Sequence, residues 1–352
     1  MKKKINHIFP VFSPHLSLPI IKSFVSLYHT LPIDQSFFIY GTSDDVLREK
    51  YKELDDSSIV YKYLSSLSDV VKLVKEKKGE SFIVHSDAYD ILLRLSLMNV
   101  KYSWICWGAI PNLNITSIKS IINRVRWKFS LKRMNAVITL LKTDKEEINS
   151  IYTKARTILM PYNNVDQLCF EERFQKHCFH TPPRVLVGNN GHCYNSYLQV
   201  LQILKKFSGQ IEVHVMFQYP NNQEQKNNLR KIGNDIFGSS CFYIDDQMMN
   251  REDYYAYISD FDIYICHDLS QTGLGAIYNS LYFGKKLFLN GNNLDWLQYL
   301  GAKVYPTSGI SDLSFEEFCE SLTEEERLNN KNIIFKLWNQ KESWAEFLLK
   351  KT

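Results

Sequence analysis

Short runs of β-branched and aliphatic residues alternate along this chain with longer segments whose apolar residues recur at helical spacing. In the first half, the short runs predict strands at 5–12, 36–40, 59–63, 81–85, 102–107 and 136–140. Helical patterns fill the gaps between them, for example at 20–27, 70–77 and 88–97. Such alternation is typical of a parallel, doubly wound α/β sheet.

The second half repeats this organisation. A polar, irregular stretch at 161–183 precedes further predicted strands at 185–188, 211–217, 242–244, 262–266, 286–290 and 303–305, and helical patterns at 315–324 and 332–350 close the chain. The 352 residues exceed the usual single core, and about 100–200 residues per domain gives two. We therefore expect an N-terminal Rossmann-like domain at 1–160, a linker at 161–183, a second Rossmann-like domain at 184–330, and a C-terminal helix at 331–352 that packs back on the N-terminal domain.

Glycine-containing turns follow two of the predicted strands in the second half. Gly188 and Gly191 let backbone N–H groups approach an anion, and the helix behind them presents the positive end of its dipole. A second such turn contains Gly273 and Gly275. This second turn does not fit the dinucleotide fingerprint, which needs three glycines and an acid about twenty residues further on. Two anion-binding turns on one sheet predict a nucleotide diphosphate across the strand ends, although each could be an ordinary strand-to-helix turn.

Composition narrows the class of protein. Hydrophobic residues at 45% suffice for packed cores, and no window approaches the eighteen or so apolar residues that span a bilayer. The basic start at 1–7 resembles the beginning of a signal peptide. However, Pro10, Pro14 and His15 interrupt the apolar stretch that follows, and no small-residue cleavage site is present. We expect a cytoplasmic protein.

Cysteine and acidic patterns predict no metal. The seven cysteines form no C-x-x-C pair, so disulfides and zinc ribbons are not expected. The cluster of Cys169, His177, Cys178 and His180 lacks the paired spacing of zinc sites. The D-x-D pattern at 260–262 immediately precedes a buried strand, where acids commonly mark the boundary of the element.

Positive charge is concentrated at 117–133. Apolar residues at 118, 121, 122, 125 and 129 recur at helical spacing with basic residues around them. Such a helix can lie on an anionic bilayer, with Trp127 at the interface. The basic residues expected at the lipid surface are Arg124, Arg126, Lys128 and Lys132. The alternative is a helix packed on its own domain. Nucleic acid is not an expected partner, because no stacking platform accompanies the basic residues and the net charge is only +4.

Several motifs together resemble glycosyltransferase family 56. They are 187–191 with Asn195, Tyr219-Pro220, Gln271-x-Gly273-x-Gly275, Leu289-Asn290 with Asn293 and Trp296, and in the first half Pro14-His15, His85 and Trp107-Gly108. The resemblance implies a GT-B architecture, in which two Rossmann-like domains face each other across a cleft with a closing C-terminal helix.

The resemblance also implies an activity. It is transfer of a fucose-type (acetamido-)dideoxyhexose from a dTDP-sugar to a polyprenyl-diphosphate-linked saccharide. The product would belong to surface polysaccharide (O-antigen of lipopolysaccharide, capsule or enterobacterial common antigen), made by a peripheral protein on the cytoplasmic face of the inner membrane. Ala109-Ile110 departs from the Ala-Asp that follows Trp-Gly in the family, and this favours an O-antigen or capsule acceptor. A sugar-nucleotide epimerase of related architecture and a non-catalytic nucleotide-binding protein remain alternatives.

Site residues follow from the strand ends and the resemblance. Those expected to bind the donor are Gly188, Asn189, Gly191, Asn195, Tyr219, Gln271, Thr272, Gly273, Gly275, Asn290 and Asn293, and those expected to bind the acceptor are Trp107 and Gly108. Helix N-termini can stabilise the departing diphosphate, so we expect no metal and no cofactor, the nucleotide-sugar being a substrate. His85 and His15 each follow a predicted strand and are candidates for the general base, with a hydrogen-bonded loop histidine as the alternative for each. The stereochemical outcome stays open.

Overall fold

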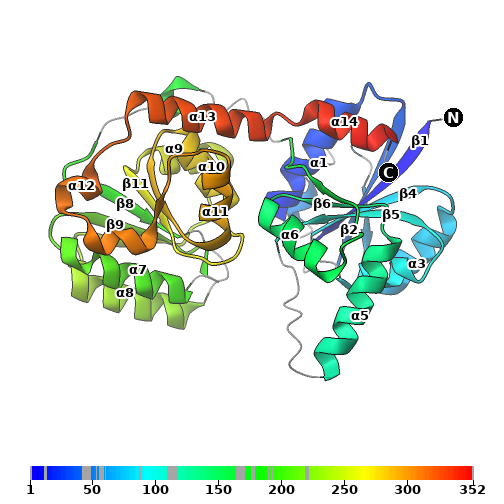
Figure 1. Cartoon of the computed structure of the whole chain (residues 1–352), viewed down its shortest axis with the longest axis horizontal. Coiled ribbons are helices and arrows are strands. Elements are labelled where there is room, and N and C mark those ends of the chain that lie inside the picture. The colour runs from blue at the N-terminus through cyan, green and yellow to red at the C-terminus, as the bar shows by residue number, and fades with distance from the viewer. Residues whose placement is uncertain are drawn as a thin grey trace. The chain divides into compact units, whose positions relative to one another are not determined.

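The structure is a computed structural model that describes residues 2–11, 14–41, 49–52, 54, 59, 61–86, 89–108, 118–163, 171–175, 179–188, 190–191, 194–218 and 222–350, with only the backbone at 14–16 and 118. The chain divides into two compact units, one made of Met1–Asn164 with Trp338–Thr352 and the other of Val165–Leu337 (Figure 1). Each unit holds one parallel sheet with helices between its strands. This confirms the predicted α/β class with two Rossmann-like folds.

The first unit is built on a seven-stranded sheet of order β3-β2-β1-β4-β5-β6-β7, in which every neighbouring pair is parallel. Its strands are β1 (Lys3–Pro10), β2 (Ile33–Tyr40), β3 (Tyr61–Leu64), β4 (Ser81–His85), β5 (Lys101–Cys106), β6 (Ala136–Thr139) and β7 (Thr157–Leu159). The chain first adds strands on one side of β1 and then on the other, so the topological switch point lies between β1 and β4. Sequence patterns missed β7, because an edge strand of three residues shows no periodicity.

Helices cover both faces of this sheet. They are α1 (Pro14–Tyr28) and α14 (Lys341–Lys350) on one face, and α3 (Leu67–Glu76), α4 (Tyr89–Ser96), α5 (Ile118–Arg133) and α6 (Lys142–Ile151) on the other. Along β4, Ile83 joins the cluster under α1 and α14, whereas Phe82 and Val84 join the opposite cluster. This alternation follows from the two-residue period of a strand. Apolar residues therefore occupy both faces, as parallel sheets require.

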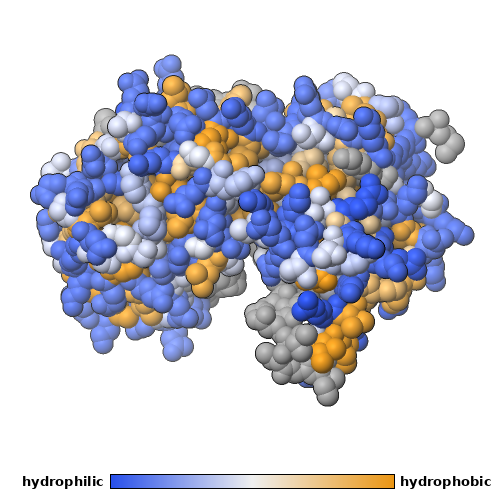
Figure 2. Space-filling model, in the orientation of Figure 1, coloured by the Kyte–Doolittle hydropathy of each residue, from blue (hydrophilic) through white to orange (hydrophobic). Residues whose placement is uncertain are grey.

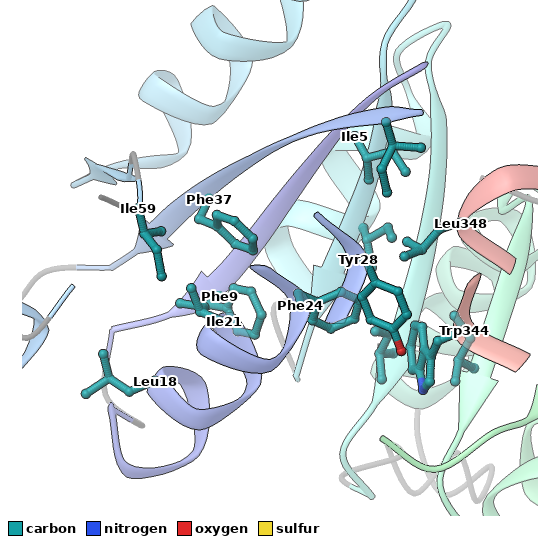
Figure 3. Packing of buried hydrophobic residues seen from close by; sticks show 14 of the residues in the cluster. Ile5, Phe9, Leu18, Ile21, Phe24, Tyr28, Phe37, Ile59, Trp344 and Leu348 are labelled. Carbon is teal, nitrogen blue, oxygen red and sulfur yellow. The ribbon is translucent and has the colours of Figure 1, made fainter. Parts of the chain in front are cut away.

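The C-terminal helix α14 is part of the core of the first unit (Figure 3). Trp344, Phe347 and Leu348 are buried in the same cluster as Phe24 and Tyr28 of α1. The Trp344 indole donates a hydrogen bond of 2.9 Å to the carbonyl of Pro161. Near the other end of the helix, the Lys3 ammonium donates to the carbonyls of Leu348 and Leu349. Buried aromatic area and hydrogen bonds at both ends hold α14 on the sheet.

The second unit is built on a six-stranded parallel sheet of order β10-β9-β8-β11-β12-β13. Its strands are β8 (Arg184–Val187), β9 (Glu212–Met216), β10 (Phe242–Asp245), β11 (Ile263–Cys266), β12 (Lys286–Leu289) and β13 (Tyr305–Pro306). Its helices are α7 (Tyr194–Leu204), α8 (Gln223–Phe237), α9 (Arg251–Ser259), α10 (Leu274–Tyr282), α11 (Gly291–Tyr299), α12 (Phe315–Cys319) and α13 (Glu324–Trp338), the last ending at the boundary of the unit. The switch point of this sheet lies between β8 and β11.

Among the helices that the structure describes, none has both the length and the apolar character that crossing a membrane requires.

Candidate functional site

Two sequence-predicted turns meet at the carboxyl edge of the second sheet. Gly188 directly follows β8, residues 267–273 follow β11, and Asn290 follows β12. These three strands are neighbours, and the first two flank the switch point. In open α/β sheets, ligands bind at the carboxyl ends of the strands near such a point. We call this the donor edge.

Three helices begin at the donor edge without the usual neutralising groups. The N-cap residues of α10 and α11, Gly273 and Asn290, make no side-chain capping hydrogen bond, and the first turns of α7, α10 and α11 contain no acid. By contrast, Asn222 and Asn250 cap α8 and α9, whose first turns are acidic. The donor edge therefore combines the positive ends of three dipoles without a first-turn acid with two helix starts that lack a side-chain cap, a combination that suits an anion.

The loop at 267–273 is fixed from three sides. The Ser196 hydroxyl of α7 donates to the Asp268 carboxylate at 3.2 Å, and the backbone N–H of Asn292 donates to the carbonyl of Leu269 at 2.9 Å. The His267 ring nitrogen Nδ1 lies 2.5 Å from the Thr307 hydroxyl. The groups at its tip are thus positioned before any ligand arrives.

Gly291 is a position at the donor edge that sequence patterns missed. Its φ is +53°, and a Cβ there would lie 2.2 Å from the carbonyl oxygen of Leu269. Only glycine lets the loop approach the start of α11 this closely. The one available signal was a glycine directly after Asn290, at a predicted helix start.

The structure revises the expected role of Asn293. Its side chain is 1% exposed, and its amide donates to the carbonyl of Thr272 at 2.8 Å. It therefore lies beneath the loop and supports it, which argues against the expected contact with the donor. Thr272, Gln271 and Gly273 are half-buried and Gly275 is exposed. Asn195 is exposed in the first turn of α7, whereas Asn189 and Tyr219 lie outside the described residues.

Gly188 and Gly191 are required by packing before any ligand is considered. A Cβ at Gly188, whose φ is +75°, would lie 1.7 Å from the Tyr197 ring, and one at Gly191 would lie 2.5 Å from Phe217. The Tyr197 hydroxyl is buried 2.6 Å from the carbonyl oxygens of Asn190 and Met216, which fixes the ring. A Cβ at Gly275 would meet nothing within 4 Å.

At the carboxyl edge of the first sheet, which we call the acceptor edge, the predicted residues lie on neighbouring strands. His85 ends β4, and Trp107 and Gly108 follow β5. Directly after His85 comes Ser86, the one non-glycine among the described residues with positive φ, at 70°. Hydrogen bonds from Ser86 N–H to Ile105 and from the Trp104 indole to Ser86 hold it there. Strained backbone of this kind gathers at functional edges, and no sequence pattern marked it.

His85 does not reach the surface. It is 0% exposed, and its two ring nitrogens lie 3.1 Å from Nδ1 of His7 and 2.7 Å from the Tyr162 hydroxyl. Burial lowers the pKa of His85 well below its usual value and that of His7 to about 3, so both rings are neutral. This argues against the predicted role of His85 as a base, because a base must lie within hydrogen-bond reach of the acceptor hydroxyl. His15 lies in the first turn of α1, and its side chain is outside the described residues.

Helix α5 turns the predicted apolar stripe outward. Ile121, Ile122, Val125 and Phe129 are 47%, 45%, 63% and 38% exposed (Figure 2). Trp127 points the other way, with its ring centroid 5.2 Å from that of Trp104 and 4.9 Å from that of Tyr89. Trp127 is therefore a packing residue of its own unit, which corrects the expectation that it lies at a bilayer interface.

The D-x-D pattern has structural partners. Asp262 accepts hydrogen bonds from the backbone N–H groups of Arg184 and His180, and Asp260 pairs with the Arg184 guanidinium. Within the described ranges, no group of three or more His, Cys, Asp or Glu side chains could hold a metal ion. Cys169, His177 and Cys178 lie outside those ranges.

Gly188→Ala should destabilise the protein by about 2 kcal/mol or more, because the new methyl group meets the fixed Tyr197 ring in an overpacked site. Denaturant unfolding measures this loss. Gly275→Ala is the matched control and should be neutral or stabilising by up to about 1 kcal/mol, since alanine is the better helix former. A Gly188→Ala variant as stable as wild type would contradict the packing described here.

Several solved structures share the fold over essentially the whole chain. A glycosyltransferase from Rickettsia africae superposes with a TM-score of 0.69 at 13% identity, covering 100% of each chain. Anabaena Alr3699/HepE in complex with UDP and glucose gives 0.68 at 10% identity, covering 98% of this chain and 99% of its own. The UDP-GlcNAc 2-epimerase from Neisseria meningitidis, bound to UDP-GlcNAc, gives 0.60 at 13%, covering 99% and 100%.

At these identities the similarities establish the fold, which is the GT-B architecture. No curated protein matches the chain in sequence. A family model described as 4-alpha-L-fucosyltransferase, glycosyl transferase group 56, matches residues 2–352. The chain therefore belongs to glycosyltransferase family 56 and is a glycosyltransferase.

Proposed function

We propose that this enzyme transfers a fucose-type (acetamido-)dideoxyhexose from a dTDP-sugar to a polyprenyl-diphosphate-linked saccharide during synthesis of surface polysaccharide. The observation that carries the donor half is the meeting of three helix N-termini without a first-turn acid at the donor edge, of which those of α10 and α11 also lack a side-chain cap. The family description supports fucosyl transfer. Anabaena HepE, of the same fold, holds a nucleoside diphosphate and a hexose. The epimerases share the fold as well, but the family match favours a transferase.

The donor edge supplies charge stabilisation for the leaving group. As the bond from sugar to diphosphate breaks, negative charge grows on the departing oxygen. Backbone N–H groups at the starts of α7, α10 and α11, already oriented by the fixed loop, stabilise that charge without reorganising. Transfer by this route is metal-independent.

The acceptor hydroxyl loses its proton to a base at the acceptor edge. With His85 buried, His15 is the remaining histidine of the predicted pair. It stands in the first turn of α1, directly after β1 and thus beside the switch point of the first sheet. Trp107 and Gly108 follow a strand of the same edge and take the acceptor saccharide.

Helix α5 holds the enzyme on the anionic cytoplasmic face of the inner membrane. Its exposed apolar residues form one stripe, and at 100° per residue the basic side chains fall on both flanks of that stripe. An apolar stripe between cationic flanks is the pattern of a helix lying in the headgroup region. A peripheral position there brings the acceptor edge to a lipid-linked substrate.

Gly275→Asp should remove nucleotide binding without harming the fold. The carboxylate would stand in the exposed first turn of α10, where it stabilises the helix by about 0.3–1 kcal/mol and repels the diphosphate. Thermal shift with dTDP, UDP and GDP measures both effects, and we expect dTDP to stabilise the wild type most. Gln210→Glu adds the same charge at the opposite end of the sheet and should bind normally. Unchanged dTDP affinity in Gly275→Asp would exclude the donor edge as the diphosphate site.

His15→Ala should lower turnover by about 10²–10⁴, the usual contribution of a positioned base. Nucleotide affinity should stay unchanged, because the donor edge belongs to the other unit. His29→Ala, at the exposed far end of α1, is the control. Near-normal turnover of His15→Ala would place the base elsewhere.

Replacing Arg124, Arg126, Lys128 and Lys132 with Gln should release the protein from anionic vesicles, since each basic residue near the surface contributes about 1 kcal/mol. Activity on a short water-soluble acceptor should survive. The control replaces four exposed lysines of the same unit, Lys72, Lys75, Lys78 and Lys101. Retention on vesicles by the α5 variant would show that the helix does not dock on lipid, and a change in oligomeric state would instead indicate self-association.

A further inference from the structure

A continuous chain of hydrogen bonds crosses the core of the first unit. Its links run from the Trp107 indole to the Tyr162 hydroxyl (2.9 Å), from Tyr162 to His85 (2.7 Å), from His85 to His7 (3.1 Å), from His7 to Gln35 (3.1 Å) and from Gln35 to the carbonyl of Phe24 (3.2 Å). The chain therefore joins the end of β5 to β4, β1, β2 and helix α1.

With both imidazoles neutral, the donor and acceptor of every link are determined. The Trp107 indole can only donate, and the carbonyl of Phe24 can only accept. Gln35 therefore turns its NH₂ toward Phe24 and its oxygen toward His7, which donates from Nε2 and accepts at Nδ1. His85 in turn donates from Nε2 and accepts at Nδ1, where the Tyr162 hydroxyl donates. Because burial keeps both imidazoles neutral, one arrangement of protons satisfies all five links.

Helix α14 packs against Tyr162, near one end of this series of hydrogen bonds. The Trp344 ring lies parallel to that of Tyr162, at 5.6 Å between centroids and 5° between planes. The Tyr162 ring is also nearly parallel to that of His85, at 5.9 Å between centroids and 9° between planes. With its indole bonded to Pro161, Trp344 fixes the ring that receives the Trp107 hydrogen bond.

A purely apolar core would hold the sheet together equally well, because buried polar groups add specificity of geometry more than stability. What these hydrogen bonds add is a defined orientation for Trp107. This residue is half-buried and lies at the acceptor edge, directly after β5. Of the other members, His85 and His7 are fully buried and Tyr162 is partly buried.

We propose that His7, His85, Tyr162 and Trp344 are positioning residues that hold the Trp107 indole in place for the acceptor. None of them touches substrate. The inference rests on the proposed function, in that the acceptor is taken to bind where Trp107 emerges. It gives the buried histidines a role that does not require contact with the acceptor hydroxyl. It also gives α14 a role in the acceptor site, through Trp344.

Tyr162→Phe tests the proposal, since it removes the hydroxyl that serves two links. We expect kcat/KM for the acceptor to fall by up to about 10²-fold, the scale of a misplaced binding group. Affinity for dTDP should not change. Trp107→Phe should cause a similar loss, and the double variant should be no worse than either single one, because both break the same link. Tyr102→Phe is the matched control, a buried tyrosine that bonds a backbone carbonyl in the opposite cluster. Normal acceptor kinetics in Tyr162→Phe, or losses that add in the double variant, would overturn the proposal.

A second readout needs no turnover and so separates this inference from the proposed function. In ¹⁵N NMR spectra, both imidazoles should show the neutral Nε2–H tautomer, and the Trp107 indole resonance should shift in Tyr162→Phe but not in Tyr102→Phe. Gln35 is partly buried and bonds His7 at the end of the series opposite Trp107. Gln35→Leu should therefore disturb the tautomers of both histidines and shift the Trp107 indole resonance. This variant replaces Tyr162→Phe in the test if Tyr162→Phe does not fold. An indole resonance unmoved in every folded variant of the chain would overturn the positioning role even if the enzyme is active.

Discussion

Each parallel sheet of this protein is covered by helices on both faces, and that burial decides where chemistry can occur. Strand residues point into apolar clusters on alternate sides, so a substrate has no access to the sheet faces. Only the strand ends are left, and among them the carboxyl ends beside a switch point, where neighbouring connections diverge. Both candidate edges stand at such points. The helix N-termini of the donor edge and the buried hydrogen bonds of the acceptor edge determine what each edge can bind.

At the donor edge, what matters is which helix ends are left unneutralised. Asparagine caps and first-turn acids satisfy α8 and α9, whereas α10 and α11 have neither. An uncapped helix end costs stability, by about 1 kcal/mol for a missing cap. Two of them after adjacent strands make sense if a ligand supplies the missing acceptor oxygens. The rigid loop at 267–273 and Gly291 then fix the geometry of that binding.

At the acceptor edge, buried polar groups have a different task. A histidine in an apolar core must be neutral and fully hydrogen-bonded, and that requirement leaves the pair of His7 and His85 with a single proton arrangement. The same burial that removes His85 from direct catalysis makes it a rigid support. Structural packing and substrate positioning are thus carried by one set of side chains.

The sequence by itself determined the α/β class, two Rossmann-like folds, and the turns after β8 and β11, because strand and helix periods and glycine turns are local properties. It also indicated the family, through motifs spread over the whole chain. Only the tertiary structure decided that Gly188 is needed for Tyr197, that Asn293 lies under a loop, that Trp127 faces inward, and that His85 is buried. Side-chain exposure depends on which strands become neighbours and which helix covers them. His7 and His85 lie 78 residues apart in the chain, and no local pattern can reveal that they share a hydrogen bond.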